Sequence, residues 1–309
     1  MSRESDGTEF GPDRGDLFGT FVVDWLTATG ERVGTALVDS SIYLSFIAMV
    51  EVAIGMVLLS LPASPAPVII ALVTFAVYTN DHLVDDPTSS PRAAFVAQYR
   101  RSLNLFAALG YGLAVAIAAL SGPPAFLFTL VPGIFWILYA SGRIPLVGLN
   151  IRQLKRTLVV NTTLVALAWA ITLTFLPLAF AARALTVTVP VVLGYFFLRS
   201  LVDTIIPNVR DRAADRSAGV STIPVRFGLG TTRSVLYGID AASAVLIVGA
   251  MASGVIPPAI AAALLVGVVY SLALTTVMGR GPAPETIAIA TEFEYVLVGI
   301  ALIPVVYLG

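Results

Sequence analysis

The stretch VIIALVTFAVYTNDHLVDD, residues 68–86, runs from a continuous apolar segment directly into a cluster of acidic side chains. Apolar segments long enough to cross a bilayer, which takes about 20 residues, recur along the chain from about residue 40 to its end. Of the residues in the chain, 57% are hydrophobic and only 12% are charged. In soluble domains roughly a quarter of the residues are charged. The sequence therefore predicts an all-α integral membrane protein.

Pro, Gly and charge clusters divide the apolar sequence into nine segments, each a candidate transmembrane helix. We expect residues 38–309 to form a bundle of these nine helices. Residues 1–37 form a polar tail, in which 15–36 are either an interfacial amphipathic helix or a plain linker. The nine predicted spans are 40–61, 65–81, 99–120, 123–141, 155–178, 184–206, 232–253, 256–278 and 287–308.

The distribution of basic residues predicts the orientation of these spans. Among the 18 Lys and Arg residues, only Arg183 falls on the side opposite the N-terminus, and Arg199 falls inside a span. Lys and Arg accumulate in cytoplasmic loops. The sequence therefore predicts a multi-pass protein of the cell membrane with a cytoplasmic N-terminus and an external C-terminus.

The inventory of reactive side chains excludes several classes of site. The chain has no cysteine, and His82 is its single histidine, so disulfides, thiolate nucleophiles and multi-histidine metal centres are excluded. Membrane topology explains the scattered arginines, and nothing in the sequence favours nucleic-acid binding. The oligomeric state cannot be read from the sequence.

Two acidic clusters follow even-numbered spans on the same predicted side of the membrane. Asp81 and Asp85 are spaced i, i+4, and Asn208, Asp211 and Asp215 are spaced i, i+3, i+7, so each set shares one helical face. Carboxylate oxygens suit Mg²⁺, which shares its coordination with phosphate oxygens. The clusters thus indicate a Mg²⁺ site for a phosphorylated substrate, and solvated helix ends are the alternative.

Basic residues follow the fourth span on the same side. Lys155 and Arg156 can hold diphosphate oxygens that the metal does not take, or they are ordinary cytoplasmic charges.

Three motifs together resemble the UbiA superfamily of intramembrane prenyltransferases. They are NDxxxDD at 80–86, YASGRIPLVGLNIRQLKR at 139–156 and NVRDRAADRSAGVSTIPVRFG at 208–228. The third motif is the most specific, because it matches the family's DxxxDxxxGxxTxPxxxG pattern. The resemblance, which covers nearly the whole chain after about residue 38, includes the nine-helix architecture.

The resemblance implies a Mg²⁺-dependent transfer of a prenyl group from an isoprenyl diphosphate to a lipophilic acceptor in the membrane. The acceptor can be a quinone precursor, an ether-lipid precursor or a carotenoid. Three positions depart from the family pattern. Val84 occupies an acidic or amide position, Thr88 or Ser89 lies where the last Asp of the first motif is expected, and Asn208 replaces a common Asp. The implied catalytic metal ligands are Asp81, Asp85, Asp211 and Asp215, with Asn208 as a further ligand, and the implied substrate-binding residues include Asn80, Asn208, Tyr139, Lys155 and Arg156.

Charges inside the predicted spans form a second group of candidates, because charge at bilayer depth usually faces the bundle interior and serves a function. Arg199 and Asp203 are spaced i, i+4, which allows them to pair with each other, and both are candidate substrate-binding residues. The other members of the group are Glu51, Asp240, Glu292 and Glu294.

Two other classes of function fit parts of the pattern. A secondary transporter also uses repeated helix units and membrane-embedded carboxylates, although it places them near the centre of its spans. A catalytically inactive UbiA-like protein is the third possibility, because the first acidic motif is altered.

Overall fold

The computed structural model describes residues 41–84, 91–140, 158–217 and 219–308, and all regular structure in these ranges is helical. The predicted tail and its alternative helix over 15–36 lie outside the described residues. The helices are α2 (Ile42–Leu58), α3 (Ala66–Val84), α4 (Pro91–Ser121), α5 (Pro123–Ala140), α7 (Leu158–Ala181), α8 (Thr188–Arg210), α9 (Arg212–Ser217), α10 (Ile223–Ala252), α11 (Pro258–Val277) and α12 (Pro284–Leu308).

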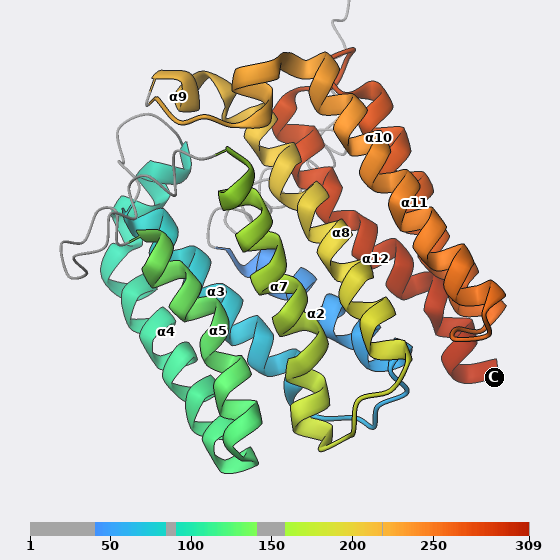
Figure 1. The fold of residues 1–309 in the computed structure, drawn as a ribbon. Coiled ribbons are helices and arrows are strands. Elements are labelled where there is room, and N and C mark those ends of the chain that lie inside the picture. The colour runs from blue at the N-terminus through green and yellow to red at the C-terminus, as the bar shows by residue number, and fades with distance from the viewer. Residues whose placement is uncertain (1–40, 85–90, 141–157, 218, 309) are drawn as a thin grey trace, which may run out of the picture.

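The long helices run up and down a single bundle (Figure 1). A short connection joins α4 to α5 at the lower end of the view, whereas the small helix α9 follows α8 at the upper end. Because α3 is antiparallel to α4, its C-terminal end lies at the same end of the bundle as α9. The two predicted acidic clusters therefore belong to one end of the molecule.

Within the described ranges, seven helices are long and apolar enough to cross a membrane. Helix α2 and the apolar part of α5 are shorter, at 10–17 residues. The all-helical, multi-pass membrane architecture is confirmed, and the count of nine spans stays a prediction.

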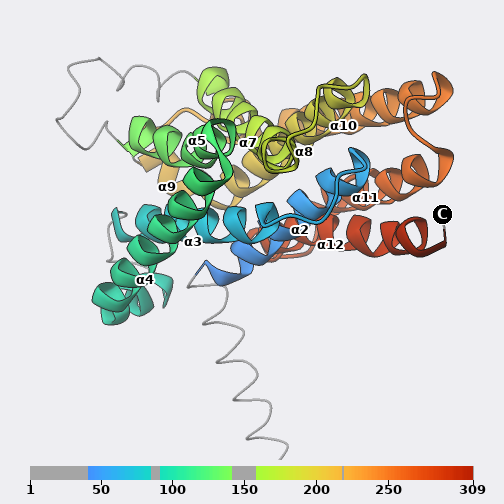
Figure 2. The same ribbon diagram turned by 90° about the horizontal axis from the view of Figure 1, so that it is seen from below.

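Helix α2 lies in the interior of the bundle, where it contacts α3, α7, α8 and α12. Figure 2 shows it between α3 and α12. The apolar side chains of Val52, Leu173 and Phe196, from α2, α7 and α8, are completely buried in the main core. This packing fixes α8, which carries the second acidic motif, against the centre of the molecule.

Two helix starts differ from the predicted spans by more than the others. Helix α4 begins at Pro91, before the predicted start at 99, and α10 begins at Ile223, before the predicted start at 232. Both early segments contain a proline and an arginine, which are the residue types at which the sequence is divided into spans, so the predicted spans do not include them. Helix α10 is also interrupted at Gly228, whose backbone has φ 78° and ψ 173°.

Candidate functional site

The first acidic motif occupies the last turn of α3. Asn80 and Asp81 are half-buried there, and the Asn80 side-chain amide donates to the Ala76 carbonyl at 2.8 Å. His82 Nδ1 lies 3.1 Å from the Ser41 hydroxyl, so the start of α2 is tied to the end of α3. Asp85, the predicted partner of Asp81, lies outside the described residues.

The second acidic motif begins where α8 ends. Asp211 caps α8, since its backbone N–H donates to the Pro207 carbonyl at 3.0 Å. Its two carboxylate oxygens accept from Arg210 Nε and Nη2, each at 2.8 Å. The side chains of this pair are 29% and 44% exposed. Because exposed ion pairs contribute only about 0–1 kcal/mol, the Asp211 carboxylate can exchange Arg210 for another ligand. Asn208, one turn earlier on α8, is half-buried.

Asp215 lies on α9, four residues after Asp211. Its backbone N–H donates to the Asp211 carbonyl at 2.8 Å, and its carboxylate accepts from the Thr222 hydroxyl at 3.4 Å. Burial and the nearby negative charge of Asp211 raise the pKa of Asp215 above its ordinary value. Two neighbouring carboxylates that oppose each other's ionisation are stabilised by a cation between them.

The local backbone structure explains why glycine, threonine and proline occur at their positions in this motif. Gly219, after α9, has φ 69°, a conformation that other residues rarely adopt. Thr222 is the N-cap of α10, and Pro224 stands in its first turn, where a missing N–H costs nothing. At Gly228, φ is again positive. The motif thus folds the chain back so that the Thr222 hydroxyl meets Asp215.

These side chains suit Mg²⁺ by their chemistry. They are hard oxygen donors that remain partly open to solvent and to phosphate oxygens. Among the described residues, however, no group of three acidic, histidine or cysteine side chains surrounds a single point. The structure brings Asp211 and Asp215 together and places Asp81 at the same end of the bundle, outside that pair.

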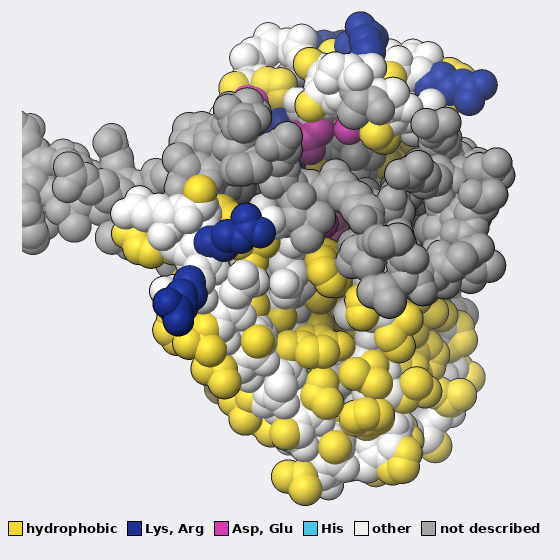
Figure 3. Space-filling view, turned by 90° about the vertical axis from the view of Figure 1, so that its left-hand side faces the viewer, with side chains coloured by type: hydrophobic (Ala, Val, Ile, Leu, Met, Phe, Trp, Pro, Cys, Tyr) yellow, Lys and Arg dark blue, Asp and Glu magenta, His cyan; other side chains and the backbone are white. Residues whose placement is uncertain are grey.

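The side of the molecule that carries α4 and α5 shows how charge is distributed (Figure 3). Its lower part is covered by apolar side chains, as a lipid-facing surface requires. Acidic side chains appear toward the upper part, next to grey residues that the structure does not describe. Lys155, Arg156 and the side chain of Tyr139 lie outside the described residues, so their predicted contacts with diphosphate stay predictions.

A buried ion cluster joins three helices deeper in the bundle. Arg199 on α8 is 0% exposed and donates from Nη1 to Asp240 Oδ1 of α10 at 2.7 Å, with Ser243 Oγ at 3.4 Å. On α12, Glu294 receives the other side of the guanidinium, with Nε 2.7 Å from Oε1 and Nη2 2.8 Å from Oε2. Arg199 is therefore the central cation of a structural cluster.

The possible pairing of Arg199 with Asp203 is wrong. Arg199 pairs with Asp240 and Glu294, whereas Asp203 accepts a hydrogen bond from the Tyr295 hydroxyl of α12. The i, i+4 spacing brings the two residues near each other on α8, but partners on other helices fit the guanidinium fork better. Tyr295 was missed at the sequence level, because no local spacing relates it to Asp203. Substrate binding by Arg199 and Asp203 stays a prediction.

An aromatic pair lies next to the first acidic motif. The ring of Tyr78, one turn before Asp81 on α3, stacks on Trp169 of α7 with ring centroids 6.2 Å apart and an interplanar angle of 21°. The pair provides π-faces near the acidic end of α3, and an aromatic face stabilises a nearby cation.

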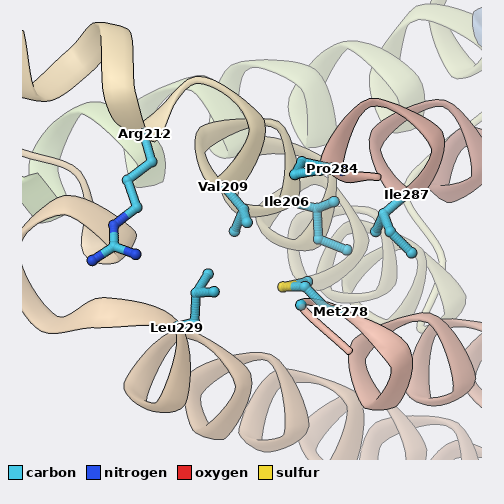
Figure 4. Close-up of a pocket in the computed structure, with 8 residues that line it drawn as sticks. Ile206, Val209, Arg212, Leu229, Met278, Pro284 and Ile287 are labelled. Atoms are coloured by element: carbon cyan, nitrogen blue, oxygen red, sulfur yellow. The ribbon is translucent and has the colours of Figure 1, made fainter. Parts of the chain in front are cut away.

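A separate cavity of about 220 Å³ lies beside the second motif (Figure 4). Among the described residues that line it, Arg212 is the one that carries a charge. A lining of this kind suits an apolar group, so the cavity is distinct from the acidic site. The remaining lining residues are Ile206, Val209, Leu229, Met278, Gly279, Pro284 and Ile287.

Comparison with known proteins shows which of them this chain is similar to. No protein-family model matches the chain. Digeranylgeranylglyceryl phosphate synthase from Korarchaeum cryptofilum (strain OPF8) is 34% identical over 148 residues, which are 48% of this chain and 47% of the relative. The match thus spans about half the length of that curated relative.

Solved structures extend the likeness over most of the chain. The apo structure of a UbiA homologue from Aeropyrum pernix K1 has a TM-score of 0.64 at 17% identity, covering 86% of this chain and 98% of the homologue. A UbiA homologue from Archaeoglobus fulgidus bound to GPP and Mg²⁺ has a TM-score of 0.58 at 19% identity, covering 84% of this chain and 94% of the homologue.

The fold and the acidic helix ends define a multi-pass helical membrane protein with a polar site at one end of its bundle. The resemblance to the UbiA superfamily that the three motifs indicated is confirmed by the matching sequence and by the shared fold.

Proposed function

We propose that the protein is a Mg²⁺-dependent intramembrane prenyltransferase, which transfers a prenyl group from an isoprenyl diphosphate to a lipophilic acceptor. The observation that carries the proposal is the pair of acidic motifs at one end of the bundle, of which the first, at Asp81, lies one turn from a stacked aromatic pair. The Archaeoglobus homologue bound to GPP and Mg²⁺ supports this proposal.

Mg²⁺ bound to these carboxylates would neutralise the charge that develops on the leaving diphosphate. Asp211 would exchange its exposed ion pair with Arg210 for this role. The freed Arg210 guanidinium would then be available to a diphosphate oxygen as a planar donor. The proposed metal ligands are Asp81, Asp85, Asn208, Asp211 and Asp215, and the proposed diphosphate contacts are Asn80, Tyr139, Lys155 and Arg156.

The allylic cation needs stabilisation and protection from water. Tyr78 and Trp169 would present π-faces to it, since they stack within one turn of Asp81. The apolar interior of the bundle would exclude water from the prenyl chain. In the proposed topology nine helices cross the membrane, the N-terminus is cytoplasmic and the acidic motifs face the cytoplasm, in agreement with the distribution of Lys and Arg.

The proposal is tested by diphosphate release from geranylgeranyl diphosphate by detergent-purified protein, with and without Mg²⁺, over a panel of acceptors. We expect release that requires both Mg²⁺ and an acceptor. Asp81→Ala and Asp211→Ala are expected to abolish it. Full activity in both variants would refute the metal site, and the absence of any binding or turnover would favour a carrier or an inactive relative.

A further inference from the structure

The cavity beside the second motif lies where three spanning helices reach the end of the bundle (Figure 4). Helix α8 ends at Arg210, α11 ends at Val277 and α12 begins at Pro284. Two residues of the cavity wall, Gly279 and Pro284, are exposed, so the cavity reaches the surface of the molecule. Since the ends of spanning helices lie at the level of the lipid headgroups, the cavity lies next to that layer of the bilayer.

Apart from Arg212, the described residues that line the cavity are apolar. Met278 and Ile287 are 1% and 3% exposed. Leu229 packs closely on the turn after α11, because a β-carbon on Gly279 would lie 3.2 Å from Leu229 Cδ1. A dry apolar cavity of about 150 Å³ accommodates benzene. At about 220 Å³, this cavity accommodates roughly eight carbon atoms of a chain, which is too few for a whole geranylgeranyl group.

Arg212 brings an unpaired positive charge to these apolar walls. Its Nε atom is buried and has no hydrogen-bond partner among the described residues. The neighbouring Arg210 differs, because its Nε and Nη2 both donate to Asp211. Within the described ranges, the ion pairs join other residues and leave Arg212 out. A buried N–H of a charged group is unfavourable without an acceptor, and an anionic group of a ligand would supply one.

A second unpaired guanidinium lies one turn from the cavity wall. Arg233 follows Leu229 by four residues on α10, so the two share one side of the helix. The Nη1 atom of Arg233 is also buried, and it too has no hydrogen-bond partner in the described part of the chain. A guanidinium is a planar donor that suits phosphate oxygens. The charge at this end of the bundle thus favours a phosphate group as the anion.

The cavity and the second acidic motif use different sides of α8. At about 100° per residue, Ile206 and Val209 lie about 100° or more around the helix from Asn208 and Asp211. The first two residues line the cavity, whereas the last two belong to the proposed Mg²⁺ site. A ligand in the cavity is therefore separate from the metal and the diphosphate of the proposed reaction.

We infer that this cavity binds an anionic membrane lipid. Its phosphate accepts hydrogen bonds from Arg212, and one of its chains places roughly eight carbons against the apolar walls. Basic pockets between spanning helices bind anionic lipid headgroups in this way. A soluble phosphate would not fill the apolar walls, and a neutral lipid would leave Arg212 without an acceptor. The inference goes beyond the proposed prenyl transfer and does not depend on it.

The bound lipid has a structural consequence for the second motif. Arg212 is the first residue of α9 and follows Asp211, which caps α8. A phosphate on Arg212 holds the start of α9, and with it the turn that carries Asp215. The lipid is therefore expected to stabilise the protein against unfolding by mass action.

The test compares two lipids with the same chains, dioctanoyl phosphatidylglycerol, which is anionic, and dioctanoyl phosphatidylcholine, which is zwitterionic. Native mass spectrometry of the full-length protein in detergent measures the affinity of each. We expect the anionic lipid to bind at least about fivefold more tightly, which is the contribution of one basic residue near a membrane surface. Equal affinities, or tighter binding of phosphatidylcholine, overturn the inference.

Two competitors distinguish other occupants of the cavity. Glycerol phosphate has the headgroup charge without the chains, and it should not displace the lipid at equal concentration. Geranyl S-thiolodiphosphate, an unreactive substrate analogue, should also leave the lipid bound when it is added with Mg²⁺. Displacement by the first would show a simple anion site, and displacement by the second would assign the cavity to the isoprenyl diphosphate. Either result overturns the inference and leaves the prenyltransferase proposal standing.

Variants locate the bound lipid. Arg212→Gln removes the charge and should reduce the preference for phosphatidylglycerol to less than about twofold. Leu229→Trp fills part of the cavity and should weaken both lipids about fivefold or more. Arg216→Gln, an exposed arginine on the same short helix, is the matched control and should retain the full preference. An unchanged preference in folded Arg212→Gln, or an equal loss in the control, overturns the inference.

Discussion

Two charged regions of the same protein are held in opposite ways. In the ion cluster of α8, α10 and α12, Arg199 is fully buried and joins residues that are 41 and 95 positions away in the sequence. In the second acidic motif, Asp211 pairs with its neighbour Arg210, and both side chains remain partly exposed. The buried cluster links helices, whereas the hydrogen bonds of the exposed motif join near neighbours in the described part of the chain.

The difference separates structural charge from charge that is available to a ligand. Removing one member of a buried ion cluster leaves an uncompensated charge, so that change should reduce stability. Removing a member of an exposed pair should hardly affect stability. Loss of the Asp211 carboxylate should instead lower the activity, because this carboxylate is a proposed ligand of Mg²⁺.

The largest effect is expected for Arg199→Ala. It leaves Asp240 and Glu294 buried without their cation and should lower the free energy of unfolding by about 3–5 kcal/mol. Thermal unfolding in detergent measures the change, with Arg280→Ala, on the exposed turn after α11, as the control. A variant as stable as the control would mean that the buried cluster does not hold the helices together.

Asp211→Asn should produce the reverse pattern. We expect Mg²⁺-dependent diphosphate release to fall about 100-fold or more, because a group that stabilises transition-state charge is weakened. The free energy of unfolding should change by less than about 1 kcal/mol, because the pair with Arg210 is exposed. Parallel assays of release and thermal unfolding check both values. A large loss of stability with unchanged activity would reverse the comparison.

Gly267→Ala tests the close packing of the buried cluster. A β-carbon at this position in α11 would lie 2.7 Å from Val298 Cγ2 and 2.9 Å from Glu294 Oε1. Overpacking of this kind should lower the free energy of unfolding by about 1–3 kcal/mol. In Gly249→Ala the added carbon meets nothing within 4 Å. Thermal unfolding should therefore show this control to be no less stable than the wild type.

The smallest effect is expected at Asp215. Burial and Asp211 raise the pKa of Asp215, and the Thr222 hydroxyl opposes that shift. Protons compete with Mg²⁺ for a carboxylate, so Mg²⁺ affinity should increase as the pH rises through this pKa. Thr222→Val removes the opposing hydrogen bond, so the same increase should occur at higher pH, with affinity about two- to fivefold lower on the acidic side. Mg²⁺ titrations over a pH series test this, and superimposable curves would contradict it.

Hydropathy predicted the spans best where a helix is apolar throughout. The predicted span 256–278 closely matches α11, Pro258–Val277, because prolines precede it and its ends are uncharged. The predicted spans miss the starts of α4 and α10, because each contains a proline and an arginine, which mark the ends of apolar segments. The positive φ at Gly228 is a conformation that span prediction does not address.

The candidate site could be predicted only where its contacts are local. The spacing of Asp211 and Asp215 anticipates their proximity, which the structure shows. The partners of Arg199 could not be found in this way, because Asp240 and Glu294 reach it through the packing of three helices. For the same reason nothing in the sequence related Tyr295 to Asp203.

The central claim is that the ends of α3 and α8 form one site for Mg²⁺ and diphosphate. The most direct measurement is Mg²⁺-dependent binding of geranyl S-thiolodiphosphate to the wild type, Asp81→Asn, Asp211→Asn and the double variant. If both carboxylates serve one site, either substitution alone should remove most of the binding, and the double variant should be hardly weaker than the single ones. Losses that add independently, or binding that survives in the double variant, would contradict the claim.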